Sequence, residues 1–429
     1  MSPVSRRGFL AGAGGLGVLA GAGAAAGCTR GSSGAGSSGS SGGAAGADRA
    51  GPRFVPFRGA TQSGVTALPV PALGLMAAFD AVADGRDDLR RCLRELTDEV
   101  RALMAGEPIE QRDPEYPPVD SGLLGTEPPA DDLAIVASVG AGLFDARYGL
   151  AERRPVELVE MPFLANDRLD PARSHGDLLL TFEAGHPDTL MFALRQVMRR
   201  TRRWLVLRWL VDGFTRGTSP ADGSAGAPRN LLGFKDGTAN LDPADAAVMA
   251  RHVWVSPEDT IAGGGAEPEW TEGGSYHVVR VIRMLVEFWD RVRLSEQEAI
   301  MGRHKLSGAP LGMSAETDLP DYASDPDGEI VPLDAHIRLA NPRTPGTEDS
   351  LIMRRGFSYS RGFDAAGQLD QGLAFVSYQR SLARGFLAVQ ERLTGEPLEE
   401  YVRAEGGGFY FALPGVAGDS GYLGQGLLA

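Results

Sequence analysis

Three short segments in the second half of the chain contain the side chains best suited to chemistry. Residues 233–240 read GFKDGTAN and put Asp236 in a turn between glycines. Residues 336–343 read HIRLANPR, and residues 354–360 read RRGFSYS. A turn carboxylate can move a proton, an imidazole can bind a metal ion, and a guanidinium can stabilise negative charge. The residues alone do not show whether His336 binds a metal ion, because it is one of six histidines and no spacing distinguishes it.

The composition excludes several classes of protein. The chain has 429 residues, of which 43% are hydrophobic and 23% charged, as in ordinary globular proteins. Its net charge of −14 disfavours nucleic acid as a partner. Cys28 and Cys92 are too few for a disulfide scaffold or a cysteine-ligated metal site. The fold must therefore rest on its hydrophobic core, and we expect Cys92 to be a small core residue.

The N-terminus has the features of an export signal. Residues 5–10 read SRRGFL, and a stretch without charged residues follows as far as Gly27. This pattern predicts a twin-arginine signal peptide over residues 1–27, so we expect an extracytoplasmic protein, periplasmic or secreted. The many glycines in the stretch disfavour a membrane-spanning helix.

The end of this signal allows two kinds of cleavage. Residues 25–28 read AAGC and resemble a lipoprotein cleavage box, which predicts a lipid anchor at Cys28. Ala24 and Ala26 also suit an ordinary signal peptidase, which would release a soluble protein. Residues 31–46 are all Gly, Ser or Ala, so residues 28–52 are predicted to be a flexible linker.

Hydrophobic periodicity predicts a strand–helix–strand pattern twice in the first half of the chain. Helical spacing of apolar residues is clear over 86–105, and His186-Pro187 begins a second helix. The predicted strands are 68–80, 133–139, 177–182 and 204–211. This βαββαβ order predicts an N-terminal ferredoxin-like α+β domain over residues 53–218.

The second half repeats this pattern after a linker at 219–228, which predicts a second ferredoxin-like domain over 219–429. Its predicted strands are 276–289, 372–378 and 407–413, and its predicted helices are 295–303 and 381–393. A long irregular segment, 306–345, interrupts this unit. Irregular segments of that length inside a domain are usually functional.

With these segments, the chain resembles the dye-decolourising (DyP-type) haem peroxidases, and in particular their twin-arginine-exported subgroup. The resemblance covers residues 50–425 and includes GRHKLSGAPLG from Gly302 and GQLDQGLAFVSYQR from Gly367. His336 follows Asp236 by 100 residues and precedes Arg354 by 18, as the family requires. The resemblance implies a duplicated ferredoxin-like sandwich of the dimeric α+β barrel superfamily.

The resemblance also implies a haem site. His336 matches the proximal ligand of the haem iron, and Asp236 matches the distal acid/base residue. Arg354 matches the distal arginine, since the 18-residue interval selects it over its neighbour Arg355. A carboxylate on the far nitrogen of the ligand would strengthen its donation to the iron, and position alone suggests Glu399 or Glu400. Further haem contacts are expected at Gly237, Thr238, Ala239, Asn341, Pro342 and Arg343, of which Arg343 would meet a propionate.

The function implied is a haem b peroxidase that uses hydrogen peroxide to oxidise bulky phenolic or dye-like donors, linked to iron or haem-iron acquisition. An unperturbed aspartate has a pKa of about 3.9, so Asp236 as the base predicts activity that peaks below neutral pH. The alternatives are a deferrochelatase that releases iron and leaves the porphyrin intact, and a lipid-anchored haem carrier. Expected partners are an iron-uptake permease and further copies of the chain.

Overall fold

The computed structural model describes residues 53–216, 226–258 and 265–429. The predicted signal peptide 1–27, the linker 28–52 with Cys28 and residues 217–225 around the predicted domain boundary lie outside the described residues. Among the residues described, no helix is both long and apolar enough to cross a membrane.

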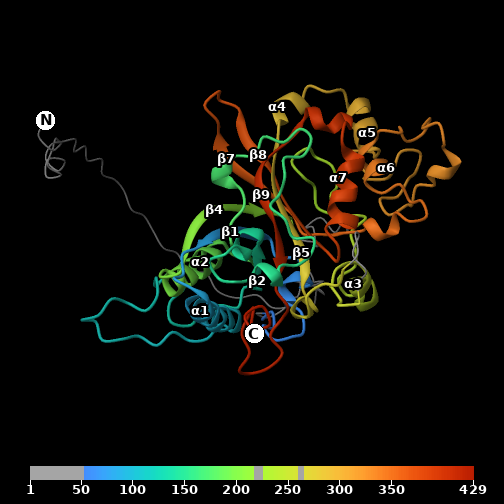
Figure 1. The fold of residues 1–429 in the computed structure, drawn as a ribbon. Coiled ribbons are helices and arrows are strands. Elements are labelled where there is room, and N and C mark those ends of the chain that lie inside the picture. The colour runs from blue at the N-terminus through green and yellow to red at the C-terminus, as the bar shows by residue number, and fades with distance from the viewer. Residues whose placement is uncertain (1–52, 217–225, 259–264) are drawn as a thin grey trace, which may run out of the picture. The chain divides into compact units, whose positions relative to one another are not determined.

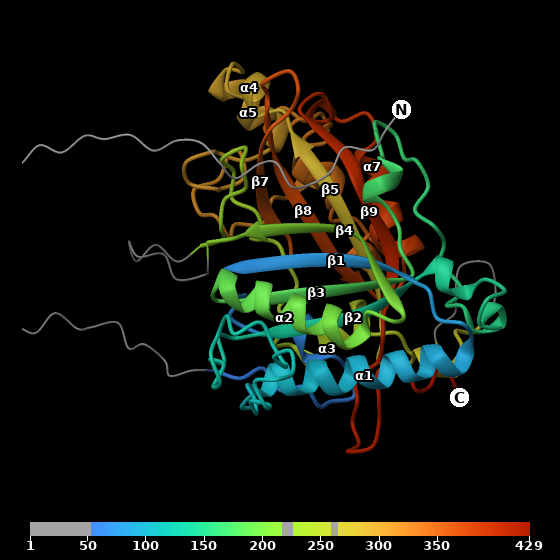
Figure 2. The same ribbon diagram turned by 90° about the vertical axis from the view of Figure 1, so that its left-hand side faces the viewer.

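The first half of the described chain is an antiparallel sheet with two helices on one face (Figures 1 and 2). Its strands follow the order β4-β1-β3-β2, the arrangement expected for a ferredoxin-like unit. The elements are β1 (Leu73–Ala81), α1 (Arg86–Ala105), β2 (Ala134–Gly140), β3 (Leu178–Ala184), α2 (Pro187–Thr201) and β4 (Leu205–Phe214). The predicted helix over 86–105 is confirmed in full.

The sequence explains how these helices pack on the sheet. On α1, Leu89, Leu93 and Leu96 recur at helical spacing and are fully buried against the strands. Gly106 ends the helix in a left-handed conformation, with φ of 61°. Cys92 lies in the same core, as predicted, and burial raises the pKa of its thiol to about 12.

The second half has the same sheet order, β7-β8-β5-β9, so the predicted duplication is confirmed. Its strands are β5 (Ser275–Met284), β6 (Met353–Arg354), β7 (Phe357–Phe363), β8 (Leu369–Gln379) and β9 (Val402–Ala412). Its helices are α3 (Ala246–His252), α4 (Val286–Trp289), α5 (Leu294–Met301), α6 (His336–Ala340) and α7 (Ala388–Leu393). A π-helical turn, Ala383–Leu387, leads directly into α7.

The two sheets join into a closed barrel. β2 pairs with β9 at one junction, and Phe214 of β4 pairs with Ser358 of β7 at the other. Figure 2 shows the strands of the first sheet running across those of the second. Alternate residues of each strand face the interior of this barrel, which we call the lumen. On β1, Met76 and Ala78 face the lumen, whereas Leu75 packs towards α1 and α2.

Several sequence-based predictions of the strands and helices were wrong. The predicted strands 68–80 and 407–413 begin instead at Leu73 and Val402. The predicted strand 276–289 ends at Met284, because the chain turns at Leu285 and continues as α4. A continuous apolar run does not distinguish a strand from a short buried helix, and here Trp289 must reach a separate core cluster. Strand β7 was missed, because its residues include Ser, Arg and Gly. The predicted helix 381–393 begins instead as the π-helical turn.

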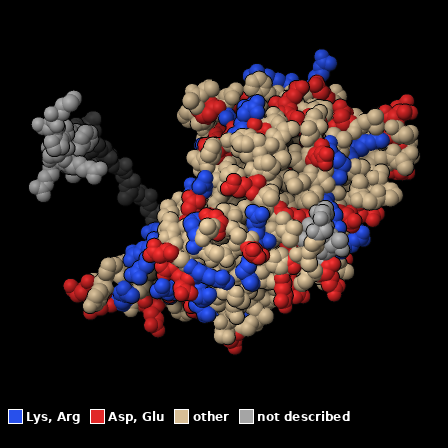
Figure 3. Space-filling view, viewed as in Figure 1, with Lys and Arg blue, Asp and Glu red and all other residues tan. Residues whose placement is uncertain are grey.

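The irregular segment 306–345 is confirmed as mainly turns and loops, and it includes α6 (Figure 1). It has no Lys or Arg between Lys305 and Arg338. Elsewhere, Figure 3 shows basic side chains interspersed with acidic ones over the described part of the face in view. The segment therefore contributes to the net charge of −14 and brings a histidine to the second sheet.

Candidate active site

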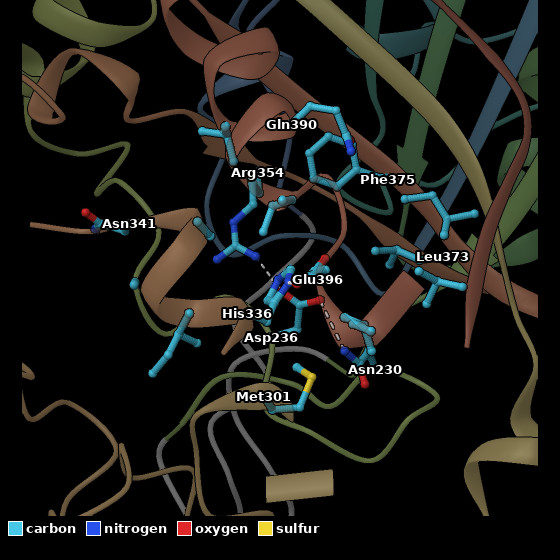
Figure 4. Close-up of a pocket in the computed structure, with 18 of the residues that line it drawn as sticks. Asn230, Asp236, Met301, His336, Asn341, Arg354, Leu373, Phe375, Gln390 and Glu396 are labelled. Atoms are coloured by element: carbon cyan, nitrogen blue, oxygen red, sulfur yellow. Dashed lines mark hydrogen bonds and ion pairs between the residues drawn. The ribbon is translucent and has the colours of Figure 1, made fainter. Parts of the chain in front are cut away.

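A cavity of about 300 Å³ lies between the outer face of the second sheet and its helices (Figure 4). In the first half of the chain the corresponding space is filled by α1 and α2. The cavity wall is mainly apolar and includes Ile282 of β5, Leu373 and Phe375 of β8, and Val389 of α7. The duplicated sheet thus supports a packed core on one side and an internal binding site on the other.

Asp236 enters the cavity from a turn that is held at both ends. The Asp236 backbone N–H donates to the carbonyl of Pro228 at 2.7 Å, and Arg229 forms a β-bridge with Lys235. The side-chain amide of Asn230 approaches one carboxylate oxygen of Asp236 at 3.5 Å. The other carboxylate oxygen accepts a hydrogen bond of 2.6 Å from Arg354 Nη1.

Arg354 reaches the same place from the short strand β6. Asn240, at the end of the GFKDGTAN segment, binds the Arg354 backbone twice: its side chain accepts from the N–H and donates to the carbonyl, both at 2.8 Å. The neighbouring Arg355 follows β6 and points to the lumen, because its backbone N–H still bonds β8 and successive residues of an extended chain face opposite sides. It forms a buried ion pair with Glu183, so Arg354 is the arginine at the cavity.

His336 begins α6 and lies near this pair. Its Nδ1 is 2.8 Å from a carboxylate oxygen of Glu396, whose side chain is 6% exposed. Burial alone would lower the pKa of His336, but the charge and hydrogen bond of Glu396 outweigh it, so the pKa lies above its ordinary value. The negative charge of Asp236 also raises this pKa, and the positive charge of Arg354 lowers it.

The expectation that Glu399 or Glu400 is the partner of His336 is wrong. Helix α7 ends at Leu393, and Gly395 follows in a left-handed conformation with φ of 84°. The chain reverses there, and Glu396 is the carboxylate that faces the imidazole (Figure 4). Glu399 and Glu400 follow in a separate 3₁₀ turn. The place at which the chain turns determines which of Glu396, Glu399 and Glu400 contacts His336.

The structure brings most of the other predicted contacts to the cavity wall: Gly237, Thr238, Ala239, Asn341 and Arg343. Pro342 is not among the residues that line it. Gly237 has a φ of 118°, a conformation that residues with a side chain rarely adopt. The glycine after Asp236 is therefore required by the backbone of this turn.

Sequence reasoning missed Glu316, which holds the Asp236 turn from the irregular segment. Its carboxylate accepts from the Thr238 hydroxyl at 2.8 Å and the Ala227 backbone N–H at 2.9 Å, and it pairs with Lys235. Burial raises the pKa of Glu316, but these contacts lower it further, to below its ordinary value. Nothing in the sequence distinguishes Glu316 from the other acids of its segment.

These observations can be compared with known proteins. Residues 62–215 match the family model described as Dyp-type peroxidase, N-terminal, and residues 227–417 match its C-terminal counterpart. The chain therefore belongs to the family of DyP-type peroxidases, which are haem-dependent enzymes, and it is an enzyme of that class. The resemblance seen in its motifs is confirmed.

The chain is also similar to individual proteins of this family along most of its length. The protein named Deferrochelatase from Escherichia coli (strain K12) is 49% identical over 374 residues, which cover 87% of each chain. The structure of ferric DtpA from Streptomyces lividans is 36% identical, with a TM-score of 0.77 over 88% of this chain and 98% of that one. A DyP-type peroxidase from Cellulomonas bogoriensis is 32% identical, with a TM-score of 0.76 over 88% and 99%.

The residues of the cavity fit haem, the cofactor of this family. Within the described residues, Nε2 of His336 takes part in no hydrogen bond, while Nδ1 is held by Glu396. A neutral imidazole held in this way is a typical ligand of haem iron. The apolar wall suits the face of a porphyrin, and Arg343 and Arg354 supply cations for its propionates.

Proposed function

We propose that this enzyme uses hydrogen peroxide to oxidise bulky phenolic or dye-like donors with haem b, in a reaction linked to iron or haem-iron acquisition. One observation carries the proposal. A single cavity combines a histidine–carboxylate pair, His336 and Glu396, with an acid/base–cation pair, Asp236 and Arg354. A peroxidase needs both pairs, whereas a haem-binding protein without catalysis needs only the first.

His336 and Glu396 act on the proximal side. His336 would hold the iron through Nε2, and the hydrogen bond from Nδ1 to Glu396 fixes the tautomer and the plane of the ring. The buried carboxylate also makes the imidazole a stronger electron donor. Bound haem supplies a redox-active iron with a coordination position free for peroxide.

Asp236 and Arg354 act on the peroxide. Asp236 accepts the proton from one peroxide oxygen and returns it to the other, so that the second oxygen leaves as water. Arg354 stabilises the negative charge that develops as the O–O bond breaks. Their contact of 2.6 Å holds the aspartate beside a permanent cation, and Asn230 and Asn240 fix the approach of each side chain.

The size of the cavity bears on the donor. At about 300 Å³ it is at the lower end of the range for small-molecule pockets. Bound haem would occupy most of this space and leave more room for hydrogen peroxide than for a bulky aromatic donor. We therefore propose that such donors give up electrons at the protein surface.

Optical spectra of the haem-reconstituted protein before and after stoichiometric peroxide test the proposal. We expect wild type to convert to an oxidised spectrum, His336→Ala to lose haem, and Asp236→Asn to slow conversion by about two orders of magnitude. His186→Ala, at the start of α2, and Asp242→Asn, in an exposed turn, are matched controls. Bound haem whose spectrum does not respond to peroxide would contradict a peroxidase and favour a carrier.

A second candidate, iron release from haem, is favoured by the 49% identity to a protein named Deferrochelatase. In this reaction iron leaves and the porphyrin takes up two protons at its nitrogens. Incubation of the dithionite-reduced holoprotein with a ferrous chelator would show metal-free porphyrin fluorescence together with one chelated iron per porphyrin. Loss of the Soret band without porphyrin fluorescence would indicate ring destruction instead.

We further propose that residues 1–27 direct twin-arginine export and that Cys28 carries a lipid anchor. The support is the SRRGFL segment and the AAGC box. Labelling with a radioactive fatty acid would mark wild type and not Cys28→Ser, and Arg6→Lys/Arg7→Lys would leave the precursor uncleaved. An iron-uptake permease as partner and a homo-oligomer stay proposals, testable by crosslinking in the membrane and by light scattering.

A further inference from the structure

A buried ion pair crosses the lumen of the barrel directly behind the cavity. Arg355 donates from Nε and Nη2 to the two carboxylate oxygens of Glu183, at 2.7 and 2.6 Å. Both side chains are less than 5% exposed. The lumen here also contains Met353 of β6 and Phe357 and Tyr359 of β7, whose side chains are at most 2% exposed. A bidentate pair of full charges is thus enclosed in the core, where the buried Tyr378 is also within electrostatic range of both charges.

Such a pair is a weak contributor to stability. Removing two charges from water costs several kcal/mol, and an apolar pair of similar volume is often as stable or more stable. The best-attested use of buried charges is to select one register among alternatives. At the end of β6, two adjacent arginines make such a choice of register necessary.

Arg354 ends β6 and Arg355 follows it, and the register of this segment on β8 decides which of the two reaches the cavity. Arg354 pairs with Ser377 of β8, and Arg355 donates its backbone N–H to Val376 at 2.8 Å. A slip of one residue would move Arg355 to the cavity side and turn Arg354 away. The two side chains are identical, so they do not themselves distinguish these alternatives, although the buried Met353 and Phe357 and the Asn240 hydrogen bonds to the Arg354 backbone favour the observed register.

Glu183 adds a contact that selects between the two arginine side chains themselves. It lies on β3, with its side chain in the lumen, and can accept only the arginine that points inwards. β3 belongs to the first half of the chain and is not a neighbour of β6 or β7 in the sheet order. Figure 2 shows β3 separated from β7 by β1 and β4. The pair therefore ties the cavity strand to the opposite wall of the barrel.

We propose that Glu183 is a positioning residue for Arg354: by binding Arg355 across the lumen, it holds β6 in the register that presents Arg354 to Asp236. The inference rests on the proposed peroxidase function, in which Arg354 acts on the distal side. Through Glu183, the first half of the chain would thus help to position Arg354 in a cavity that the second half forms.

Fluoride binding to the ferric haem-loaded protein tests this inference without turnover. The bound anion accepts hydrogen bonds, so its affinity reports whether the Arg354 guanidinium is in place. The main variant is Glu183→Met/Arg355→Met, which removes the pair and leaves no unpaired buried charge. We expect it to bind fluoride about tenfold more weakly than wild type, within the range of coupling between contacting residues.

A double-mutant cycle with Arg354→Ala shows whether the effect passes through Arg354. In that background the Glu183→Met/Arg355→Met substitution should cause no further loss of affinity. Asp177→Asn is the control, because it breaks another buried carboxylate's contacts, with Arg147 and the Ala81 backbone, outside the cavity. It should lower the unfolding midpoint but leave fluoride binding unchanged.

Each result has a defined meaning. Wild-type fluoride affinity in the Glu183→Met/Arg355→Met variant would overturn the inference, and so would an undiminished loss in the Arg354→Ala background. If Arg354→Ala itself leaves fluoride binding unchanged, the distal role of Arg354 fails first. Should the methionine variant not fold, Glu183→Gln, which keeps one hydrogen bond to Arg355, should weaken fluoride binding in the same direction but by less than tenfold, and wild-type affinity there would overturn the inference.

Discussion

His277 makes the stability of the barrel sensitive to acid. It lies in the lumen on β5, fully buried, with Nδ1 2.9 Å from the Ser138 hydroxyl. Its ring stacks on Tyr378 with the centroids 4.3 Å apart, and Nε2 has no hydrogen-bond partner among the described residues. Burial lowers the pKa of His277 from 6.5 to about 3. The folded protein therefore keeps this imidazole neutral at pH values where the unfolded chain is protonated.

The sign and size of the effect follow from proton linkage. Above pH 6.5 the imidazole is neutral in both states and its full contribution to stability is present. As the pH falls below 6.5, only the unfolded chain takes up the proton, so stability is lost. Between pH 7 and pH 5 the loss is about 2 kcal/mol, and since both values lie well above 3 it is set almost entirely by the unfolded pKa.

Urea unfolding of wild type and His277→Asn at pH 7 and pH 5 measures this quantity. Asn retains a polar atom for Ser138 but does not titrate, so the drop in free energy of unfolding should be about 2 kcal/mol smaller in the variant. All other titrating groups are common to both proteins and cancel in this difference. Equal drops would refute the reasoning, as would an NMR titration of folded wild type in which His277 protonates above pH 5.

Three further predictions concern the site and its support. Glu396→Gln should return the raised pKa of His336 in the haem-free protein towards its ordinary value, seen by NMR, and speed haem loss by about tenfold or more; an unchanged pKa would exclude Glu396 as its cause. Glu316→Ala should slow conversion by peroxide by about tenfold while haem binding persists, because the Asp236 turn loses its anchor, and equal rates would contradict this. Trp289→Ala should cost about 3–5 kcal/mol of unfolding free energy, and a loss below 1 kcal/mol would show that the cluster around it collapses readily.

In the first half of the chain, the local hydrophobic pattern was sufficient to predict the order of the strands and helices. Helix α1 was predicted with its observed bounds, because apolar residues at helical spacing and a terminal glycine agree on the same ends. The second half was harder to predict, since its helices cover a cavity rather than a packed core. An apolar run there ends in α4, and β7 lacks the hydrophobic signature of a buried strand.

The sequence by itself determined the family, the export signal as a hypothesis, and the identities of Asp236, His336 and Arg354 as candidates. These rest on residue types at fixed spacing, which are visible along one chain. Only the tertiary structure decided that Glu396 rather than Glu399 or Glu400 faces the histidine.

The same holds for the contacts of Glu316 with the Asp236 turn and of Glu183 with Arg355 across the lumen. The physical reason is distance along the chain. A hydrogen bond or ion pair between residues 78 or 172 positions apart depends on how sheets close and turns reverse, and no local pattern encodes it. Residue type limits which chemistry is available, and barrel closure determines which partners meet.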